Sequence, residues 1–566
     1  MAKIPHLFLE ARGFKSVSGL GRYPAPVILL PAWHLLLQKM HLISRTLLPI
    51  LLAMVLCQCG APQPPQCHRV PMASRQPAAA LIATARQDWA ILGDSSRRSE
   101  WSAAQLRYNT SVARLFDQLR CGKSTWAARA DTLGTRIAPP DRQFTDPDSL
   151  NAAFPAAKIN TDALHCRQIT PGIGVPVVGW KKTTPVGVPR PPHQLPTGLP
   201  YNLTATLGFD STGLPVWQFT KRWYYEDITI RSNKHALAAD WSAANTFYWD
   251  MGNLDNLKIQ NVILPDRFSE EVGLYFIQPY DPEKIPLVFV HGLVSSPDAF
   301  KQIINDLIPD PSFRKHYQIW LFNYPTGNPW LYSGMRFREE IRSACAHART
   351  KGHDRNLNQM IVVGHSMGGL VTRSSVTDPG TKFYDTVFRA PIDQLRVGKS
   401  TRKLIRDATL YQPLTEPKRV VFMAVPHQGS PVATFRAAVW ISRLIRIPKN
   451  LTIELLDATV QGVNDALKGE QARPDMPNSI SSLSPKDKSN IALATMPLPK
   501  NIRFHSIIGD RGRGGTPNCS DGIVPYWSSH VAPVDSELIV PCNHGVPDNE
   551  QASIELKRIL KLHLLK

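Results

Sequence analysis

The chain has 566 residues, 43% of them hydrophobic and 19% charged, and a formal net charge of +20. It is longer than one hydrophobic core usually grows, so we expect more than one structural module. The positive charge is spread along the chain, without a basic stripe interleaved with aromatics, zinc-finger spacing or an RNP-like stretch. This pattern excludes a nucleic-acid partner, because diffuse charge reports solubility and weak association.

The first element in chain order is an export signal that begins at Met40. Arg45 precedes an apolar run that ends at Leu56, and small residues and cysteines follow. This is the order of a secretory signal peptide, and the run is too short to span a bilayer. We expect residues 40–59 to be the signal peptide and residues 1–39 to be an overlong start. A short buried helix is the alternative.

Two cysteines lie where a bacterial lipoprotein carries its acylated cysteine. The resemblance to a lipobox is imperfect, because such boxes usually have a small residue before the cysteine. Here Leu56 precedes Cys57 and Gln58 precedes Cys59. Lipidation of Cys57 and cleavage after Cys59 are therefore both open. In either case the sequence predicts an exported protein, periplasmic or anchored to the membrane by lipid.

The region before the main domain divides by composition. Residues 60–80 are rich in Pro and Gln, which is typical of a tether. Residues 81–272 are interpreted as an accessory module, helical to about residue 135 and β-rich later. The Pro-rich stretch at 171–196 is expected to be irregular. No motif in this module indicates chemistry.

From about Gly273 onward, short aliphatic runs alternate with helical stretches. Uninterrupted apolar runs joined by longer connections are typical of parallel strands buried on both faces. We therefore expect an α/β domain over residues 273–566, with a mostly parallel, doubly wound sheet and helical cap insertions. Ligands bind at the carboxyl ends of such strands, so the polar residues after each run are candidate site residues. The six runs are "PLVFVHG", "YQIWLFNYP", "QMIVVGHS", "RVVFMAVPHQGS", "FHSIIGD" and "ELIVPCNH".

The stretch "VVGHSMGGLV", which begins at Val362, places Ser366 between Gly364 and Gly368. An aliphatic run precedes the serine and a helix can follow it, which is the setting that a nucleophile elbow needs. The glycines supply space beside a serine held in an unfavourable conformation. The N-terminal amides of the following helix favour negative charge there. An ordinary serine in a Gly-rich loop is the alternative.

These residues resemble the α/β-hydrolase superfamily, in particular its lipase and esterase branch, over residues 273–566. "HGL", from His291, is similar to the family's oxyanion loop, and "VPHQGS", around His427, is similar to a "TPHxGS" segment of many lipases. The resemblance implies an oxyanion hole made by the backbone amides of Leu293 and Met367, and it requires no metal or organic cofactor. For His427, a turn that shapes the sheet edge and direct participation both stay open, and we do not expect it to be the base.

A serine hydroxyl needs a base, and the base needs an acid. The superfamily's order is Ser, then Asp or Glu, then His, which implies that His544 is the base. His505 and His530 fit this position less well. For the acid, Asp521 lies in a segment similar to the "DGLV" of several bacterial lipases, whereas Asp510 closes an apolar run. We favour Asp521, whose task would be to hold the histidine tautomer and stabilise the imidazolium.

Six cysteines remain once the signal is removed, and an exported chain with an even number permits disulfides. Cys519 lies two residues before Asp521, and Cys542 lies two residues before His544. If the acid and base loops converge on Ser366, these cysteines come close. We therefore expect a disulfide between Cys519 and Cys542.

Two insertions, at about 375–415 and 431–500, are expected to form a cap or lid. In the second, "TFRAAVWISRLIRIPKN" would align three arginines on one side of a helix. Such a basic helix suits a lid or a patch that rests on anionic lipid, and a cap helix packed on the core is the alternative. His291, Tyr324 and Trp330 are substrate-pocket candidates at strand ends. For Tyr324 and Trp330, simple packing is an equal alternative.

Together these features predict a serine hydrolase that cleaves carboxylic esters, an esterase or lipase. Its partners would be an ester or lipid substrate and, through a lipid anchor or basic helix, the membrane surface. Two other functions stay open: an acyltransferase that uses the same triad with an alcohol acceptor, and a non-catalytic envelope binding protein on a hydrolase scaffold.

Overall fold

The computed structural model describes residues 76–182, 192–195, 198–252, 272–352, 355–431, 481–516 and 518–565. These residues all belong to one compact unit of the chain, residues 61–566. The predicted start, signal peptide and acylated Cys57 lie outside the described residues, as do most of the tether and the basic helix of the second insertion.

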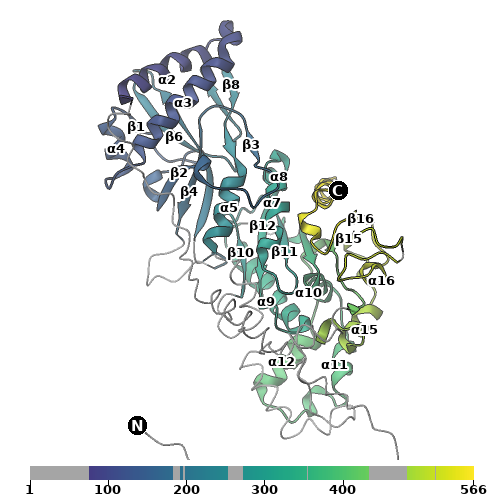
Figure 1. Ribbon diagram of the computed structural model, residues 1–566. Helices are drawn as coiled ribbons and strands as arrows, with labels where there is room; N and C mark the ends of the chain where they lie inside the picture. The colour runs from purple at the N-terminus through teal and green to yellow at the C-terminus, as the bar shows by residue number, and fades with distance from the viewer. Residues whose placement is uncertain are drawn as a thin grey trace, which may run out of the picture. The chain divides into compact units, whose positions relative to one another are not determined.

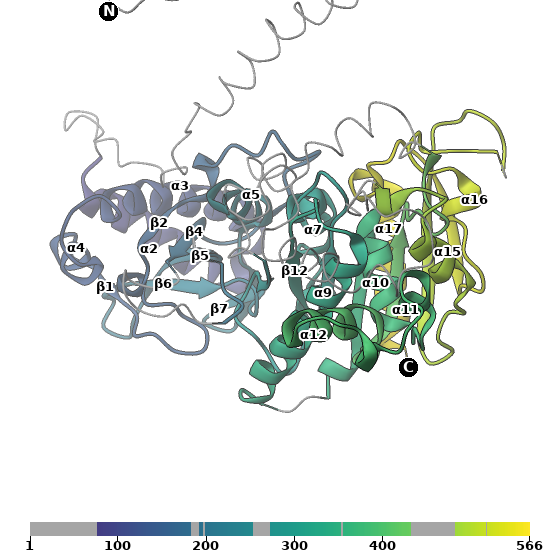
Figure 2. The same ribbon diagram turned by 90° about the horizontal axis from the view of Figure 1, so that it is seen from below.

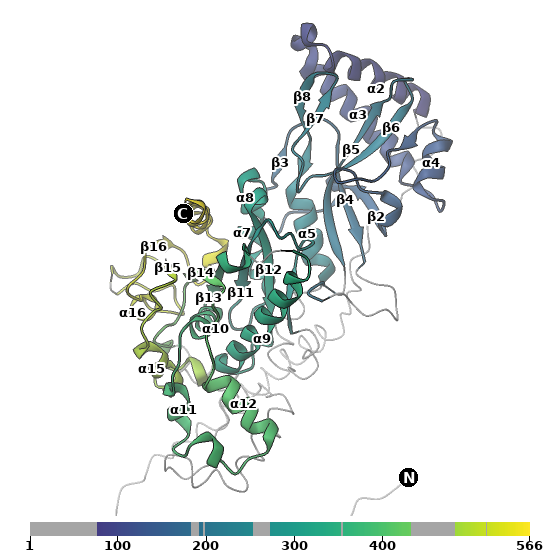
Figure 3. The ribbon, with the colours of Figure 1, turned by 180° about the vertical axis from the view of Figure 1, so that it is seen from behind.

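The accessory module consists of helices beside a five-stranded sheet with the order β1-β6-β5-β4-β2. Neighbouring strands are antiparallel except for the pair β1 and β6. Helices α2 and α3 lie side by side along the sheet (Figures 1 and 3), and their apolar faces share one buried cluster with its strands. The module begins with helices, and the strands of its sheet follow. The elements are α2 (Ala78–Leu92), α3 (Trp101–Leu119), α4 (Trp126–Thr132), β1 (Arg136–Ile137), β2 (Ala152–Pro155), β4 (Val175–Lys181), β5 (Leu199–Phe209) and β6 (Pro215–Lys221).

The expectation of an irregular stretch at 171–196 is wrong in its first half, because β4 runs through it. Val177 and Val178 are buried, and β4 pairs with β5 over its full length. Pro176 is tolerated because β2 pairs with β4 only as far as Val177, so the proline has a strand on one side only. Two short ladders complete the module: β3 (Ile169–Thr170) with β9 (Ala239–Asp240), and β7 (Asp227–Ile230) with β8 (Asn233–Ala236).

All six predicted aliphatic runs are strands of one seven-stranded sheet with the order β10-β12-β11-β13-β14-β15-β16. Neighbouring strands are parallel except for the edge strand β10, which is antiparallel to β12. The predicted mostly parallel α/β sheet is therefore confirmed. The strands are β10 (Gly273–Phe276), β11 (Ile285–Val290), β12 (Tyr317–Asn323), β13 (Met360–His365), β14 (Pro417–Met423), β15 (Arg503–Asp510) and β16 (Ser536–Pro541).

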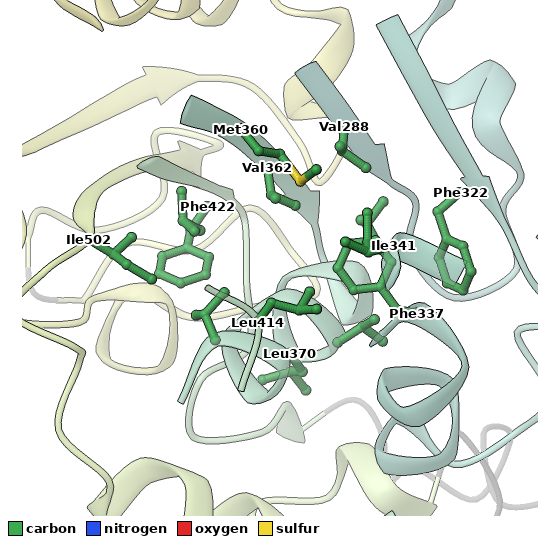
Figure 4. Close-up of a cluster of buried hydrophobic side chains, with 14 of the residues drawn as sticks. Val288, Phe322, Phe337, Ile341, Met360, Val362, Leu370, Leu414, Phe422 and Ile502 are labelled. Carbon is green, nitrogen blue, oxygen red and sulfur yellow. The ribbon is translucent and has the colours of Figure 1, made fainter. Parts of the chain in front are cut away.

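Helices cover both faces of this sheet, because successive strand residues point to opposite sides. Val288 and Val362 join the cluster under α9 and α10, whereas Leu287 and Ile361 join the cluster under α7 and α17. Figure 4 shows the first of these clusters, and Figure 2 shows the helices around the sheet. The helices are α5 (Trp241–Gly252), α7 (Lys301–Leu307), α8 (Pro311–His316), α9 (Trp330–Arg349), α10 (Met367–Val376), α11 (Lys382–Val387), α12 (Lys399–Thr409), α15 (Lys488–Thr495), α16 (Tyr526–Ser529) and α17 (Glu550–Leu564).

The accessory module is fastened to the α/β region through α5. The hydroxyl of Ser242 donates to Oδ1 of Asn305 at 2.7 Å, and the amide of Asn245 donates to the carbonyl of Lys301 at 3.1 Å. Buried side chains at such positions need these partners, because an unpaired polar group in the interior is costly. The two regions therefore share a polar, well-matched contact between α5 and α7.

The first predicted insertion contains helices α11 and α12, which lie between α10 and β14 in the chain. They enclose a small apolar cluster of their own, whose buried members are Tyr384, Phe388, Leu395 and Ile405. None of the helices in the described part of the chain combines the length and the hydropathy that a membrane crossing requires.

Candidate active site

Ser366 occupies a sharp turn between β13 and α10. Its backbone has φ 53° and ψ −127°, a conformation that costs a non-glycine residue energy and persists only where the surroundings enforce it. The amide of Ser366 donates to the carbonyl of Met423 on the neighbouring strand at 2.9 Å, which holds the turn in place. The serine therefore stands at the carboxyl end of the sheet in the strand–turn–helix setting that the sequence predicts.

Two glycines make this turn possible by close approach. A Cβ at residue 364 would lie 2.7 Å from the Cα of Gly369, and a Cβ at residue 368 would lie 2.7 Å from the carbonyl carbon of Val290. Real Cβ atoms essentially never come that close to backbone. The first residues of α10 thus pack closely against β13 on one side and against the end of β11 on the other.

His544 and Asp521 meet Ser366 in a continuous chain of hydrogen bonds. Nε2 of His544 lies 2.8 Å from Oγ of Ser366, and Nδ1 of His544 lies 2.6 Å from Oδ2 of Asp521. The Asp521 side chain is 1% exposed and the His544 side chain 21%, so the acid is enclosed while the base is partly exposed. The structure therefore brings together the three residues that the sequence nominates.

The loop around Asp521 orients its carboxylate independently of His544. Oδ1 of Asp521 accepts hydrogen bonds from the backbone amides of Ile523 and Val524, at 2.8 and 2.7 Å, which leaves Oδ2 for the imidazole. The competing acid, Asp510, accepts instead from the amide of Gly512 at 2.9 Å and stabilises its own turn. Between the two candidates, only Asp521 contacts His544.

A second histidine, which the sequence reasoning missed, supports the base. Nε2–H of His365 donates to the carbonyl of His544 at 2.8 Å, and the two rings lie 5.1 Å apart. Burial lowers the pKa of His365 to about 3, and the nearby His544 adds to this effect, so the His365 ring stays neutral. The signal in the sequence was its place directly before Ser366, at the end of the strand.

Two backbone segments flank the hydroxyl of Ser366. Met367 is the first residue of α10, so its N–H has no acceptor within the helix. From the other side, a Cβ at residue 292 would lie 2.8 Å from Cβ of Ser366, so the segment that carries Leu293 lies directly against the serine. The predicted oxyanion donors, the amides of Leu293 and Met367, thus belong to the two segments nearest the nucleophile.

The structure places the three substrate-pocket candidates in the core, which corrects the pocket role of His291 and agrees with the packing alternative for Tyr324 and Trp330. His291, Tyr324 and Trp330 are 0%, 1% and 0% exposed. The hydroxyl of Tyr324 donates to the carbonyl of His291 at 2.7 Å, and the indole of Trp330 donates to the carbonyl of Ser482 at 3.0 Å. Because backbone carbonyls accept from the Tyr324 hydroxyl and the Trp330 indole, these two side chains can be buried and pack at the end of the sheet. Burial also lowers the pKa of His291 to about 3.

The predicted disulfide between Cys519 and Cys542 is not formed, and both side chains are thiols. Cys542 packs against the apolar cluster under α17, whereas Sγ of Cys519 lies 3.9 Å from the hydroxyl of Thr516 in its own loop. The two loops do converge, but their cysteine side chains point into different surroundings. Burial raises the pKa of both thiols, for Cys542 to about 11.

No group of three or more His, Cys, Asp or Glu within the described ranges is arranged to hold a metal ion. No protein-family model and no curated protein matches this chain.

Several solved structures are similar to part of the chain. The mature lipase of Bacillus licheniformis is 14% identical with a TM-score of 0.30, over 51% of this chain and 97% of its own. A metagenomic carboxyl esterase is 18% identical with a TM-score of 0.26, over 47% and 65%. The lipase of Staphylococcus hyicus is 13% identical with a TM-score of 0.28, over 50% and 94%. Likenesses this distant carry no weight for function.

Proposed function

We propose that this protein is a serine hydrolase of the α/β-hydrolase type that cleaves carboxylic esters. The observation that carries the proposal is the hydrogen-bonded series Ser366, His544 and Asp521, with the serine held at φ 53° where a strand turns into a helix. A hydroxyl, an imidazole and a buried carboxylate in this order are the groups that the Ser-His-Asp form of acyl transfer uses.

In the first half of the reaction, Oγ of Ser366 attacks the ester carbonyl while Nε2 of His544 accepts the hydroxyl proton. The carbonyl oxygen becomes an oxyanion, which the amides of Leu293 and Met367 and the N-terminal end of α10 stabilise. Asp521 stabilises the imidazolium through the bond between its Oδ2 and Nδ1 of His544. His544 then gives its proton to the leaving alcohol, and the acyl group stays on Ser366.

In the second half, His544 takes a proton from water, and the resulting hydroxide attacks the acyl-enzyme. The same amides hold the second oxyanion, and the proton returns to Oγ of Ser366 as the carboxylic acid leaves. No step needs a metal or an organic cofactor. The 21% exposure of the His544 side chain gives water access to the base.

Labelling with a fluorophosphonate probe tests the proposal directly. The wild-type protein should be labelled once, and Ser366→Ala should lose the label completely because the probe reacts only with an activated serine. Ser375→Ala is the matched control, since Ser375 is buried on the same helix and donates to the carbonyl of Val371 at 2.7 Å. A folded wild-type protein that takes no label would contradict the proposal.

The proposal extends to the compartment and the substrate. We place the enzyme outside the cytoplasm, acting on an ester or lipid at the membrane surface. The signal-like segment that begins at Met40 supports export. Cys121 is disulfide-bonded, which suits an oxidising compartment.

Metabolic labelling with radioactive palmitate tests the anchor. The wild-type protein should incorporate the label, Cys57→Ala should abolish incorporation and Cys59→Ala should retain it. The reverse pattern, or no incorporation in any of the three proteins, would contradict acylation of Cys57.

A further inference from the structure

A cavity of about 670 Å³ lies beside the candidate active site, between α10, the loop after β14, α15 and the loop that follows Asp521. The loop after β14 is tied to the acid loop, because the amide of His427 donates to the carbonyl of Ser528 at 2.9 Å. The cavity is lined by, among others, Arg373, His427, Asn490, Met496, Trp527 and His530.

Arg373 is a buried cation without a carboxylate partner among the described residues. It lies on α10 two turns beyond Ser366, about 10 Å along the helix axis, and is 3% exposed. Its Nη2 donates to the carbonyl of Met496 at 3.1 Å, while its Nε has no hydrogen-bond partner in the described part of the protein. Burial lowers the pKa of Arg373 to about 10, and no acidic neighbour opposes that effect.

His427 adds two more unpartnered polar atoms to the same cavity. It is 1% exposed, and within the described ranges neither of its ring nitrogens has a hydrogen-bond partner. Burial, with Arg373 and His530 as lesser causes, lowers the pKa of His427 well below its usual range. Arg373 and His530 are thus the titratable groups that act on this imidazole, and neither is a carboxylate.

Buried charges in proteins are normally paired, and a guanidinium recognises carboxylate or phosphate through several parallel N–H bonds. An anion in this cavity would neutralise Arg373 and could accept from the imidazole of His427. The rest of the lining is mixed: Ile491, Met496 and Val531 are apolar, whereas Gln428, Asn490 and Thr495 are polar. The ligand class that matches both features has an anionic head and an apolar body.

We propose that the cavity beside α10 binds an anionic amphiphile, with Arg373 pairing its head group and Met496 and Val531 contacting its apolar part. The anion is either a carboxylate, as in a fatty acid, or the phosphate of a lipid head group. The site is separate from the Ser366–His544–Asp521 series and does not depend on the proposed hydrolysis.

Isothermal titration of the Ser366→Ala protein tests this without interference from turnover. Sodium octanoate serves as the anionic amphiphile, inorganic phosphate as the head-group anion alone, and octanol as the neutral amphiphile. We expect octanoate to bind, octanol to bind more weakly, and Arg373→Met in the same background to weaken octanoate by at least about tenfold. Arg338→Met is the matched control, because Arg338, on α9, is also buried but lies over the ring of Tyr411, away from this cavity's lining.

A second pair of variants covers the case in which Arg373→Met does not fold. Trp527 is 43% exposed and lines the same cavity, so replacing it should leave the fold intact. Trp527→Asp should lower the affinity for octanoate about threefold relative to Trp527→Asn, because its carboxylate would repel the carboxylate of octanoate bound near Arg373. Equal affinities in the Asp and Asn variants would overturn the proposal.

The ligand arms separate the remaining outcomes. If octanoate binds and phosphate does not, the ligand's head group is a fatty-acid carboxylate. If both bind, the cavity is an anion site whose affinity depends mainly on the ligand's head group. Octanol binding as tightly as octanoate, or octanoate binding Arg373→Met and Arg338→Met equally, would overturn it. So would the absence of heat from both octanoate and phosphate at millimolar concentration.

Discussion

Asp521→Asn should lower kcat for ester hydrolysis about 10⁴-fold while leaving KM nearly unchanged. The reason lies in the bonds on the other side of the carboxylate. Oδ1 of Asp521 already accepts from the amides of Ile523 and Val524, so the single acceptor oxygen of an asparagine will face those amides. Its NH₂ group will then face Nδ1 of His544, which forces the imidazole proton onto Nε2. In that tautomer His544 cannot accept the proton of Ser366.

Asp510→Asn provides the control in the same region. Asp510 only stabilises the turn that ends at Gly512, so this variant should keep kcat within about twofold of the wild type. Hydrolysis of a p-nitrophenyl ester gives both constants, and thermal unfolding checks that each variant is folded. A large loss in Asp510→Asn with little change in Asp521→Asn would show that the acid is assigned to the wrong residue.

The parts of the fold that could be predicted are those that the local sequence encodes. Parallel strands buried on both faces need uninterrupted aliphatic runs, so "MIVV" before Gly364 and the five similar runs could be recognised as strands. The turn at Ser366 requires small neighbours, and Gly364 and Gly368 show that requirement directly. The strand ends of a parallel sheet meet at one edge, which is why residues as distant as Ser366 and His544 could be expected together.

The features that escaped prediction depend on which way a side chain points. Cys519 and Cys542 lie in converging loops, but a disulfide also needs suitably directed Cβ atoms, and spacing in the chain does not supply that direction. Tyr324 and Trp330 follow strands at the right edge, yet their polar atoms find backbone acceptors inside the core. In the accessory module, the prolines before and after β4 concealed a strand that other strands stabilise by pairing.

Arg373 illustrates a further limit, because nothing in "GGLVTRSSV" shows that its arginine is buried. That arginine meets His427 and Asn490 only through the packing of three separate segments. The burial and missing partners of such a residue are properties of the assembled fold. A cavity of this kind therefore has to be found in three dimensions, whereas the Ser366 turn is visible in ten residues.

Gly368→Ala should lower kcat/KM by about 10³-fold and reduce the free energy of unfolding by about 1–3 kcal/mol. The new methyl group would lie 2.7 Å from the carbonyl carbon of Val290 and closer still to the carbonyl oxygens of Val290 and His291. Neither β11 nor α10 can shift without a cost in stability, since β11 is an inner strand of the sheet and α10 is buried along its length. The start of α10 must therefore move away from the segment that carries Leu293, which separates the two amides proposed to bind the oxyanion.

Gly398→Ala is the matched control, because a Cβ at residue 398 meets no heavy atom within 4 Å and its φ of −59° suits alanine. We expect this variant to behave like the wild type in urea unfolding and in ester hydrolysis. Gly368→Ala should lose activity even under conditions where it is fully folded, since a shift of the amides by a fraction of an ångström weakens them at the oxyanion. If Gly368→Ala instead retained full activity, the contact between α10 and β11 would not position the nucleophile, and the oxyanion donors would have to be sought elsewhere around Ser366.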